Sequence, residues 1–369
     1  MSAIILEAPF DLDAVPDRPA VFVIHAREGR PYLARTALLR RRLKRLLLPR
    51  AGHSRLLNLH DVAVRVEYHL TASRLGSSLT YYDLARRHFP DDYAHMIKLR
   101  LAPIVKILLA NAFPRSTITT RLSASQAFQY GPFRSRASAE RFEQEVLDLF
   151  QVRRCQEDLV VSPDHPGCIY GEMMRCLRPC QQVVGPEEYR SEVERLVHFL
   201  QTNGQSLLEP VARARDRSSE ELNFEDAQRQ HQRYHRIEQV LRLRDDLVAD
   251  VDRLCGVGVA PSIEPGCVEL LVMIKGVWLP AFEFKVAATG RESVPLDRRL
   301  RELLAGLETP RVALRERAEH ISLLARWYYS SWRDTDWIEF PRLEDLPYRR
   351  LVRAISKTAS AVQTSLFES

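Results

Sequence analysis

Residues 155–180 read CQEDLVVSPDHPGCIYGEMMRCLRPC and hold four of the six cysteines of the chain. Twelve residues separate Cys155 from Cys168, seven separate Cys168 from Cys176, and three separate Cys176 from Cys180. Four thiolates suit either a tetrahedral zinc ion or an iron–sulfur cluster. Structural zinc sites usually use cysteine pairs two residues apart, and no such pair occurs in this segment. The spacing therefore favours a cluster, with zinc as the alternative.

The same cysteines could instead be free thiols that are buried as small apolar side chains. Residues 163–180 contain Pro and Gly and are poor in aliphatic side chains, so they bury little without a cross-link. Arg154, Arg175 and Arg178 flank the cysteines and would offset the negative charge of a four-thiolate centre. We therefore expect metal ligation. The remaining two cysteines lie in strand-like sequence and are expected to be core or surface thiols: Cys255 and Cys267.

The composition is that of a globular chain with two or three modest domains: 369 residues, of which 45% are hydrophobic and 28% are charged. No apolar run approaches the roughly 18–20 residues that cross a bilayer, and the N-terminus carries acids where a signal peptide carries basic residues. We therefore expect a cytoplasmic protein without a membrane partner. The net charge of +6 is too small to indicate a nucleic-acid partner by itself, so the distribution of charge matters more.

Basic residues concentrate near the N-terminus, where nine of them occur from Arg27 to Arg50 against one acid, Glu28. Like charges at helical spacing destabilise a helix when no acids neutralise them. We therefore favour contacts with DNA phosphates over a merely solvated helix face. The expected DNA-binding residues are Arg35, Arg40, Arg41, Arg42, Lys44 and Arg45.

Residues 15–95 have the pattern of a small α+β unit. Two short apolar stretches predict strands joined by a turn, and leucines at helical spacing predict a helix with Thr36 as its N-cap. Strict alternation of apolar and polar residues then predicts a half-buried strand, and a last helix ends before Pro90. In chain order these elements cover residues 21–24, 31–34, 36–47, 62–68 and 81–87.

Three further parts complete a chain of the α+β class. Residues 96–185 form a connector, in which an amphipathic helix through Phe142 leads to the first cysteine. Residues 186–250 are charged and helical in pattern, with a polar interruption at residues 203–205, and predict a long helical arm. Residues 251–369 predict a β-meander followed by helices in a C-terminal α+β domain. The aromatic residues near its end are expected to form core or an interface rather than to stack on bases: Trp327, Tyr328, Tyr329, Trp332 and Trp337.

From about residue 15 onward the chain resembles the N-terminal two thirds of UvrC, the nuclease subunit of bacterial nucleotide excision repair. The strongest likeness joins the aromatic-Gly-Pro-aromatic sequence at Tyr130–Phe133 to the four cysteines, which match positions that hold a [4Fe–4S] cluster in that family. The segment Glu221–Ala227 is similar to the UVR motif, a helical hairpin through which UvrC engages UvrB. The resemblance thus implies a UvrB-like partner that contacts Glu221, Leu222, Phe224, Glu225 and Ala227.

The basic N-terminal unit resembles a GIY-YIG nuclease domain that has lost catalytic residues. Phe22 stands where the family has its first catalytic tyrosine, whereas Tyr32 and Arg42 match the second tyrosine and the helix arginine. Tyr81 stands at the position of the metal-binding glutamate, and a phenol is a poor ligand for Mg²⁺ or Mn²⁺. The resemblance therefore implies lost cleavage chemistry and retained DNA contacts. The RNase H-like nuclease domain of the family, which would follow the C-terminal segment, is expected to be absent.

Three functions follow from these observations. The first is a DNA-repair accessory factor that binds DNA and a UvrB-like protein, carries a cluster and does not cleave DNA. The second is an active structure-specific endonuclease that uses Tyr32, Arg42, an unaligned acid such as Glu67 or Asp83, and Mg²⁺ or Mn²⁺. The third is a protein-interaction module whose iron–sulfur cluster is structural or senses redox state.

Overall fold

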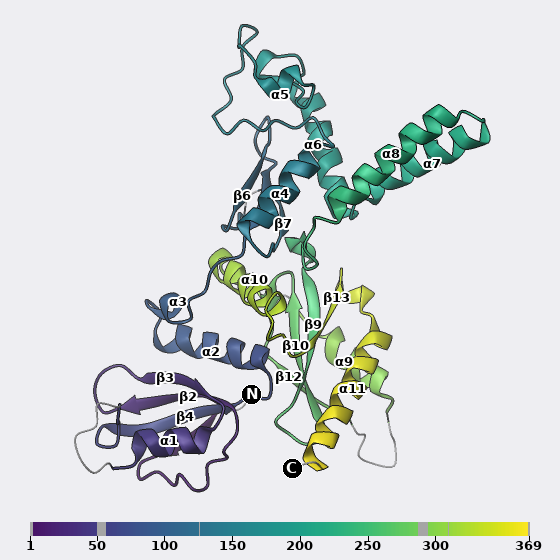
Figure 1. Ribbon diagram of the computed structural model, residues 1–369. Coiled ribbons are helices and arrows are strands. Elements are labelled where there is room, and N and C mark those ends of the chain that lie inside the picture. The colour runs from purple at the N-terminus through teal and green to yellow at the C-terminus, as the bar shows by residue number, and fades with distance from the viewer. Residues whose placement is uncertain (1–2, 50–56, 125, 287–293, 309, 368–369) are drawn as a thin grey trace. The chain divides into compact units, whose positions relative to one another are not determined.

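The computed structural model describes residues 3–49, 57–124, 126–286, 294–308 and 310–367 (Figure 1). Those residues form a mixed α+β protein with three antiparallel sheets and eleven α-helices, which confirms the predicted class. The chain divides into two compact units. The first contains Met1–Arg100, Cys255–Pro310 and Ser330–Ser369, and the second contains Leu101–Leu254 and Arg311–Tyr329. None of the helices in these described ranges combines the length and the apolar character needed to span a bilayer.

The N-terminal sheet of the first unit has the order β1-β4-β2-β3 and is antiparallel throughout. The predicted pair of strands is confirmed as β2 and β3, whereas β1 was not predicted. Helix α1 packs on one face through buried leucines, and α2 covers the other face (Figure 1). The elements are β1 (Ile4–Glu7), β2 (Ala20–Ala26), β3 (Tyr32–Thr36), α1 (Leu39–Leu47), β4 (Ala63–Leu70), α2 (Arg74–His88) and α3 (Tyr93–Met96).

Two local expectations for this sheet were wrong. Thr36 does not cap α1, because the helix begins at Leu39 and the Thr36 hydroxyl instead accepts a hydrogen bond from the Leu38 N–H at 3.2 Å. Strand β4 is not half-buried, because its polar residues Glu67 and His69 are buried as well, and Arg87 of α2 lies 3.6 Å from the Glu67 carboxylate. Polar side chains thus lie in the interior where alternation predicted exposure to solvent.

The second unit is built on a sheet of order β6-β5-β7-β8. Its core centres on aromatic rings, with the Phe142 ring 5.9 Å from Tyr130 and 5.5 Å from Phe133 between ring centroids. The predicted helix through Phe142 is confirmed as α4. The elements are β5 (Ile104–Leu108), β6 (Ser116–Thr119), β7 (Ala127–Gly131), α4 (Arg136–Leu147), α5 (Ile169–Glu172), η1 (Pro179–Gln181), α6 (Pro186–Gln201), β8 (Ala249–Asp250), η2 (Val251–Arg253) and α10 (Leu314–Tyr328).

The predicted helical arm contains an antiparallel hairpin of α7 (Gln205–Glu220) and α8 (Phe224–Leu241). The predicted interruption separates α6 from α7 at Gly204, whose φ of 88° and close approach to Leu241 leave no room for a Cβ atom. At the tip, Asn223 caps α8 by accepting the Asp226 N–H at 3.2 Å. The hairpin therefore has a defined turn at each end of α7.

The C-terminal sheet of the first unit has the order β11-β10-β9-β13, with β12 also paired to β10. Helices α9 and α11 pack against it, so the strands and helices expected after residue 255 are both present. Trp337 is buried in this unit and Trp327 is fully buried in the second, which confirms the core interpretation for these two residues. The elements are β9 (Cys255–Pro261), β10 (Cys267–Ile274), β11 (Val277–Trp278), β12 (Phe282–Lys285), α9 (Leu296–Ala305), β13 (Asp336–Phe340), η3 (Leu343–Asp345) and α11 (Tyr348–Phe367).

Candidate functional site

The four cysteines of the 155–180 segment converge between α4 and α6. Cys176 and Cys180 are buried, Cys155 is half-buried and Cys168 is exposed. The pKa of the Cys176 thiol is raised to about 11, chiefly by burial and in part by the other three thiols, which are near enough to interact with it. Burial, Cys168 and Cys155 likewise raise the pKa of Cys180. Thiols that are far apart in sequence therefore share one environment.

The four thiols do not form a compact three-ligand group in the described part of the chain. Zn–S bonds of about 2.3 Å place tetrahedral thiolates about 3.8 Å apart. Within the described ranges, only His25, Glu67 and His88 bring three ligand atoms of His, Cys, Asp or Glu within 4.8 Å of one another. No three of the four Sγ atoms are therefore grouped within this distance.

Arg153 is the basic residue that contacts a cysteine sulfur, and sequence analysis missed it. Its buried guanidinium donates to Cys155 Sγ at 3.2 Å and to the carbonyl of Phe113 at 3.0 Å. The flanking arginines singled out from sequence, Arg154 and Arg175, instead pair with the Asp148 carboxylate, so their side chains are committed to another partner. Nothing in the sequence distinguishes Arg153 from its neighbour, because the difference is one of burial.

The backbone around the last two cysteines is strained. Met174, Arg178 and Gln182 have φ values of 56°, 54° and 54°, in the left-handed region that residues other than glycine rarely adopt. The Arg178 N–H also donates to Cys176 Sγ at 3.4 Å. Apolar side chains of this loop are exposed, with Met174 75% and Ile169 60% accessible to solvent. The loop therefore has little core of its own to hold this backbone in place.

The predicted DNA-binding residues divide into two groups. Arg40 donates to the carbonyl of Val15, Arg42 donates to Tyr32 Oη at 2.9 Å and Lys44 pairs with Asp13, so these three hold nearby structure in place. The other three residues have exposed side chains: Arg35 on β3, and Arg41 and Arg45 on α1. The guanidinium of Arg35 lies 4.8 Å from the centroid of the Tyr81 ring. Arg50 lies outside the described residues.

The residues that were aligned with the GIY-YIG motif lie on the α1 face of the sheet. The rings of Phe22 and Tyr32 lie 6.1 Å apart between centroids, and Phe22 is fully buried. Glu67 belongs to the opposite face, because side chains alternate along β4 and its neighbours Val66 and Tyr68 pack against α1. The structure therefore does not bring Glu67 to the Tyr32–Arg42 pair. Asp83 is exposed on α2.

The residues predicted to contact a partner form the tip of the α7–α8 hairpin. Leu222 and Phe224 are 72% and 66% exposed although both are apolar. Glu221 and Glu225 are exposed as well, and Ala227 is half-buried on the first turn of α8. Apolar side chains that remain this exposed in a well-formed turn are typical of a contact surface.

Comparison with known proteins defines the class of this chain. Residues 103–199, which contain the β5–β7 strands, α4, the four cysteines and most of α6, match the UvrC/Cho excinuclease middle domain. The chain is therefore similar to UvrC proteins, and the likeness to a family model is confined to this middle-domain segment. No solved structure matches the chain.

Distant UvrC relatives extend this likeness over most of the chain. UvrABC system protein C of Acetivibrio thermocellus is 20% identical over 357 residues, which cover 95% of this chain and 57% of the relative. The Lachnospira eligens protein of the same name is 22% identical, with 80% and 49% covered, and that of Moorella thermoacetica is 26% identical, with 62% and 37% covered. The chain thus matches between 37% and 57% of the length of these curated relatives.

Proposed function

We propose that this protein is a DNA-repair factor related to nucleotide excision repair, which binds DNA and a UvrB-like protein and does not cleave DNA itself. The observation that carries the proposal is the convergence of four thiols within the segment that matches the UvrC/Cho middle domain. The relatives belong to the UvrABC system by name, and the exposed hairpin tip supplies a surface for such a partner.

In this proposal Cys155, Cys168, Cys176 and Cys180 hold a [4Fe–4S] cluster. The spread spacing of the four cysteines supports a cluster over zinc, and the guanidinium of Arg153 beside Cys155 would offset the negative charge of a four-thiolate centre. Such a cluster would cross-link a segment that lacks its own hydrophobic core, and it would also supply a redox centre. The protein's own contribution is to hold the four thiolates and to direct N–H groups at the sulfurs.

The proposal excludes catalysis by the GIY-YIG remnant for a geometric reason. Phe22 has no hydroxyl, and Tyr81 presents its ring to the Arg35 guanidinium instead of a carboxylate to a metal ion. Glu67 lies on the other face of the sheet from the Tyr32–Arg42 pair. The surviving residues can position a phosphate but do not provide a hard anionic ligand for Mg²⁺.

DNA binding is tested on the two exposed arginines of α1. Each phosphate contact contributes about 0.9 to the slope of log affinity against log salt, so Arg41→Ala/Arg45→Ala should reduce the slope by about two and weaken binding at every duplex sequence. The measurement is fluorescence anisotropy on damaged and branched duplexes across a salt series. The matched control, Arg213→Ala/Arg217→Ala, removes exposed arginines at the same spacing on α7 and should leave the slope unchanged.

Two outcomes of the DNA experiment would contradict the proposal. Affinity that does not depend on salt, or an equal loss in the α7 control, would exclude the basic N-terminal face and favour the pure protein-interaction function. Nicking of the bound duplex in Mg²⁺ or Mn²⁺ that disappears in Glu67→Ala or Asp83→Ala would establish the active endonuclease instead.

Partner binding is tested at the hairpin tip. An exposed aromatic anchor at an interface typically contributes at least about 2 kcal/mol, so Phe224→Ala should weaken binding to UvrB of the same organism by about thirtyfold in calorimetry. Leu314→Ala, which truncates an apolar side chain exposed on α10, is the control and should bind normally. Equal affinity for the two variants would show that the tip does not dock the partner.

A further inference from the structure

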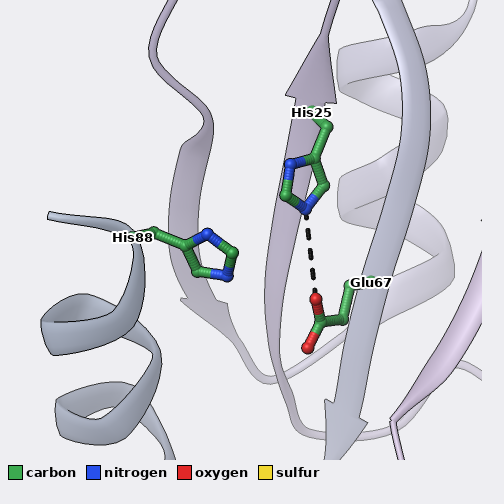
Figure 2. Close-up of side chains that lie close together, drawn as sticks. All are labelled: His25, Glu67 and His88. Carbon is green, nitrogen blue, oxygen red and sulfur yellow. Dashed lines mark ion pairs between the residues drawn. The ribbon is translucent and has the colours of Figure 1, made fainter.

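We propose that His25, Glu67 and His88 bind a divalent transition-metal ion, with Zn²⁺ the best match, on the α2 face of the N-terminal sheet. His25 comes from the end of β2, Glu67 from the middle of β4 and His88 from the last residue of α2. One ligand atom of each lies within 4.8 Å of the other two. Figure 2 shows the three side chains directed toward one another from these three elements.

The Glu67 carboxylate is already oriented for this role. Its Oε1 atom lies 3.1 Å from His69 Nε2 and 3.6 Å from an Arg87 guanidinium nitrogen, while Oε2 lies 4.0 Å from His25 Nε2. One oxygen is therefore held by outer partners and the other is directed into the cluster. Carboxylate ligands of metal ions are commonly fixed by hydrogen bonds of this kind.

The two histidines have the chemistry of ligands. His88 Nε2 is buried and has no hydrogen-bond partner, which is costly for a polar atom unless something else satisfies it. Burial lowers the pKa of both His25 and His88 below the usual value. Two neutral imidazoles and one carboxylate form a zinc donor set that leaves a fourth position open.

This site is separate from the GIY-YIG remnant. Ile24 pairs with Tyr32 across β2 and β3 and packs toward α1, so His25, the next residue, faces the other side of the sheet. A metal ion here would join the C-terminal end of α2 to the central strands. The expected effect is therefore on the stability of the N-terminal domain, whether or not the protein acts on DNA.

Two guanidinium groups lie beside the proposed site, and their positive charge would repel a bound cation. Arg65 Nη2 lies 3.3 Å from His25 Nε2, and Arg87 lies beside Glu67. The Arg65 side chain must turn away when a metal ion binds, because its charge repels the ion. Removing this charge should therefore strengthen metal binding, whereas it would weaken the binding of an anion at the same place.

The experiment is a Co²⁺ titration of the full chain, purified without oxygen so that the cysteine centre is already loaded. Co²⁺ bound by imidazole and carboxylate gives visible absorption bands without the thiolate charge-transfer bands that ligation by the cysteines would add. We expect one equivalent in the wild type, at least about tenfold weaker binding in Glu67→Gln and His88→Ala, and severalfold tighter binding in Arg65→Met. In thermal unfolding, Zn²⁺ should stabilise the wild type but should not stabilise Glu67→Gln or His88→Ala.

His95→Ala, which removes an exposed histidine of α3 in the same domain, is the matched control and should bind Co²⁺ as the wild type does. If Glu67→Gln does not fold, judged by circular dichroism, the half-buried His88 at the helix end provides the decisive variant. Identical Co²⁺ binding in all variants would overturn the proposal. Weaker Co²⁺ binding in Arg65→Met, or phosphate binding that depends on Arg65, would overturn it in favour of an anion site.

Discussion

Cys176→Ser should reduce the iron and labile sulfide of the anaerobically purified protein from about four atoms each per chain to less than about a tenth of that amount. The reason is that Cys176 is one of the two buried thiols, and an alcohol does not replace a thiolate as a ligand. Loss of the cross-link should also open the strained 174–182 loop, whose apolar side chains are exposed. Limited proteolysis should then cut between Cys155 and α6.

The control for this prediction is Cys267→Ser, which removes a half-buried thiol on β10 and should keep full iron content. One equivalent of zinc held by the cysteines of the anaerobic wild type, with no iron, would establish zinc and contradict the cluster. Unchanged iron in Cys176→Ser would show that Cys176 is not a ligand at all.

Phe142→Ala should destabilise the second unit by about 3–5 kcal/mol, the largest effect on folding that we expect from a single truncation. The Phe142 ring is fully buried and lies between Tyr130 and Phe133, so its loss leaves a cavity that the aromatic neighbours fill only in part. Because the chain has two units, the measurement is hydrogen exchange resolved by peptide. Protection should fall in β5 and β7, while the N-terminal sheet should keep its protection.

Phe224→Ala is the matched control for Phe142→Ala, since it removes the same atoms from a side chain that is 66% exposed. It should change stability by no more than about 0.5 kcal/mol. Equal loss of protection in the two variants would show that Phe142 is not at the centre of this core. Phe224→Ala should thus lose partner binding and keep its fold, whereas Phe142→Ala should lose the fold first.

Local patterns predicted the elements whose structure depends on local sequence. The pair of strands β2 and β3, the helix before the first cysteine and the interruption near Gly204 follow from periodicity and turn residues, whereas the segment at Phe224 was singled out only by its resemblance to the UVR motif. The convergence of the cysteines could also be predicted, because four cysteines in a short segment that is poor in aliphatic side chains indicate ligation of a common metal centre. Their individual roles as ligands stay a prediction.

The remaining features depend on contacts between residues that are distant in sequence. The alternating pattern of the strand predicts that Glu67 faces solvent, whereas in the structure Glu67 is buried and lies near Arg87 of α2. The local sequence predicts that Lys44 belongs to a basic face without acidic partners. In the structure Lys44 pairs with Asp13, which lies 31 positions away in the sequence. Arg153 and Arg154 are adjacent in sequence, and only burial assigns the sulfur contact to the first of them. Tertiary packing decides each of these cases.

Under the proposed function, the length of the α7–α8 hairpin separates the partner contact at its tip from the core of the second unit. Helix α8 has 18 residues and is therefore about 27 Å long at 1.5 Å per residue, so a partner that grips its tip need not approach the core of the second unit. Two modest contacts made by a single chain combine, because the first to form raises the local concentration of the other, typically to about the millimolar range. If the protein binds DNA and a protein partner as proposed, the two contacts would together hold the complex longer than either contact alone.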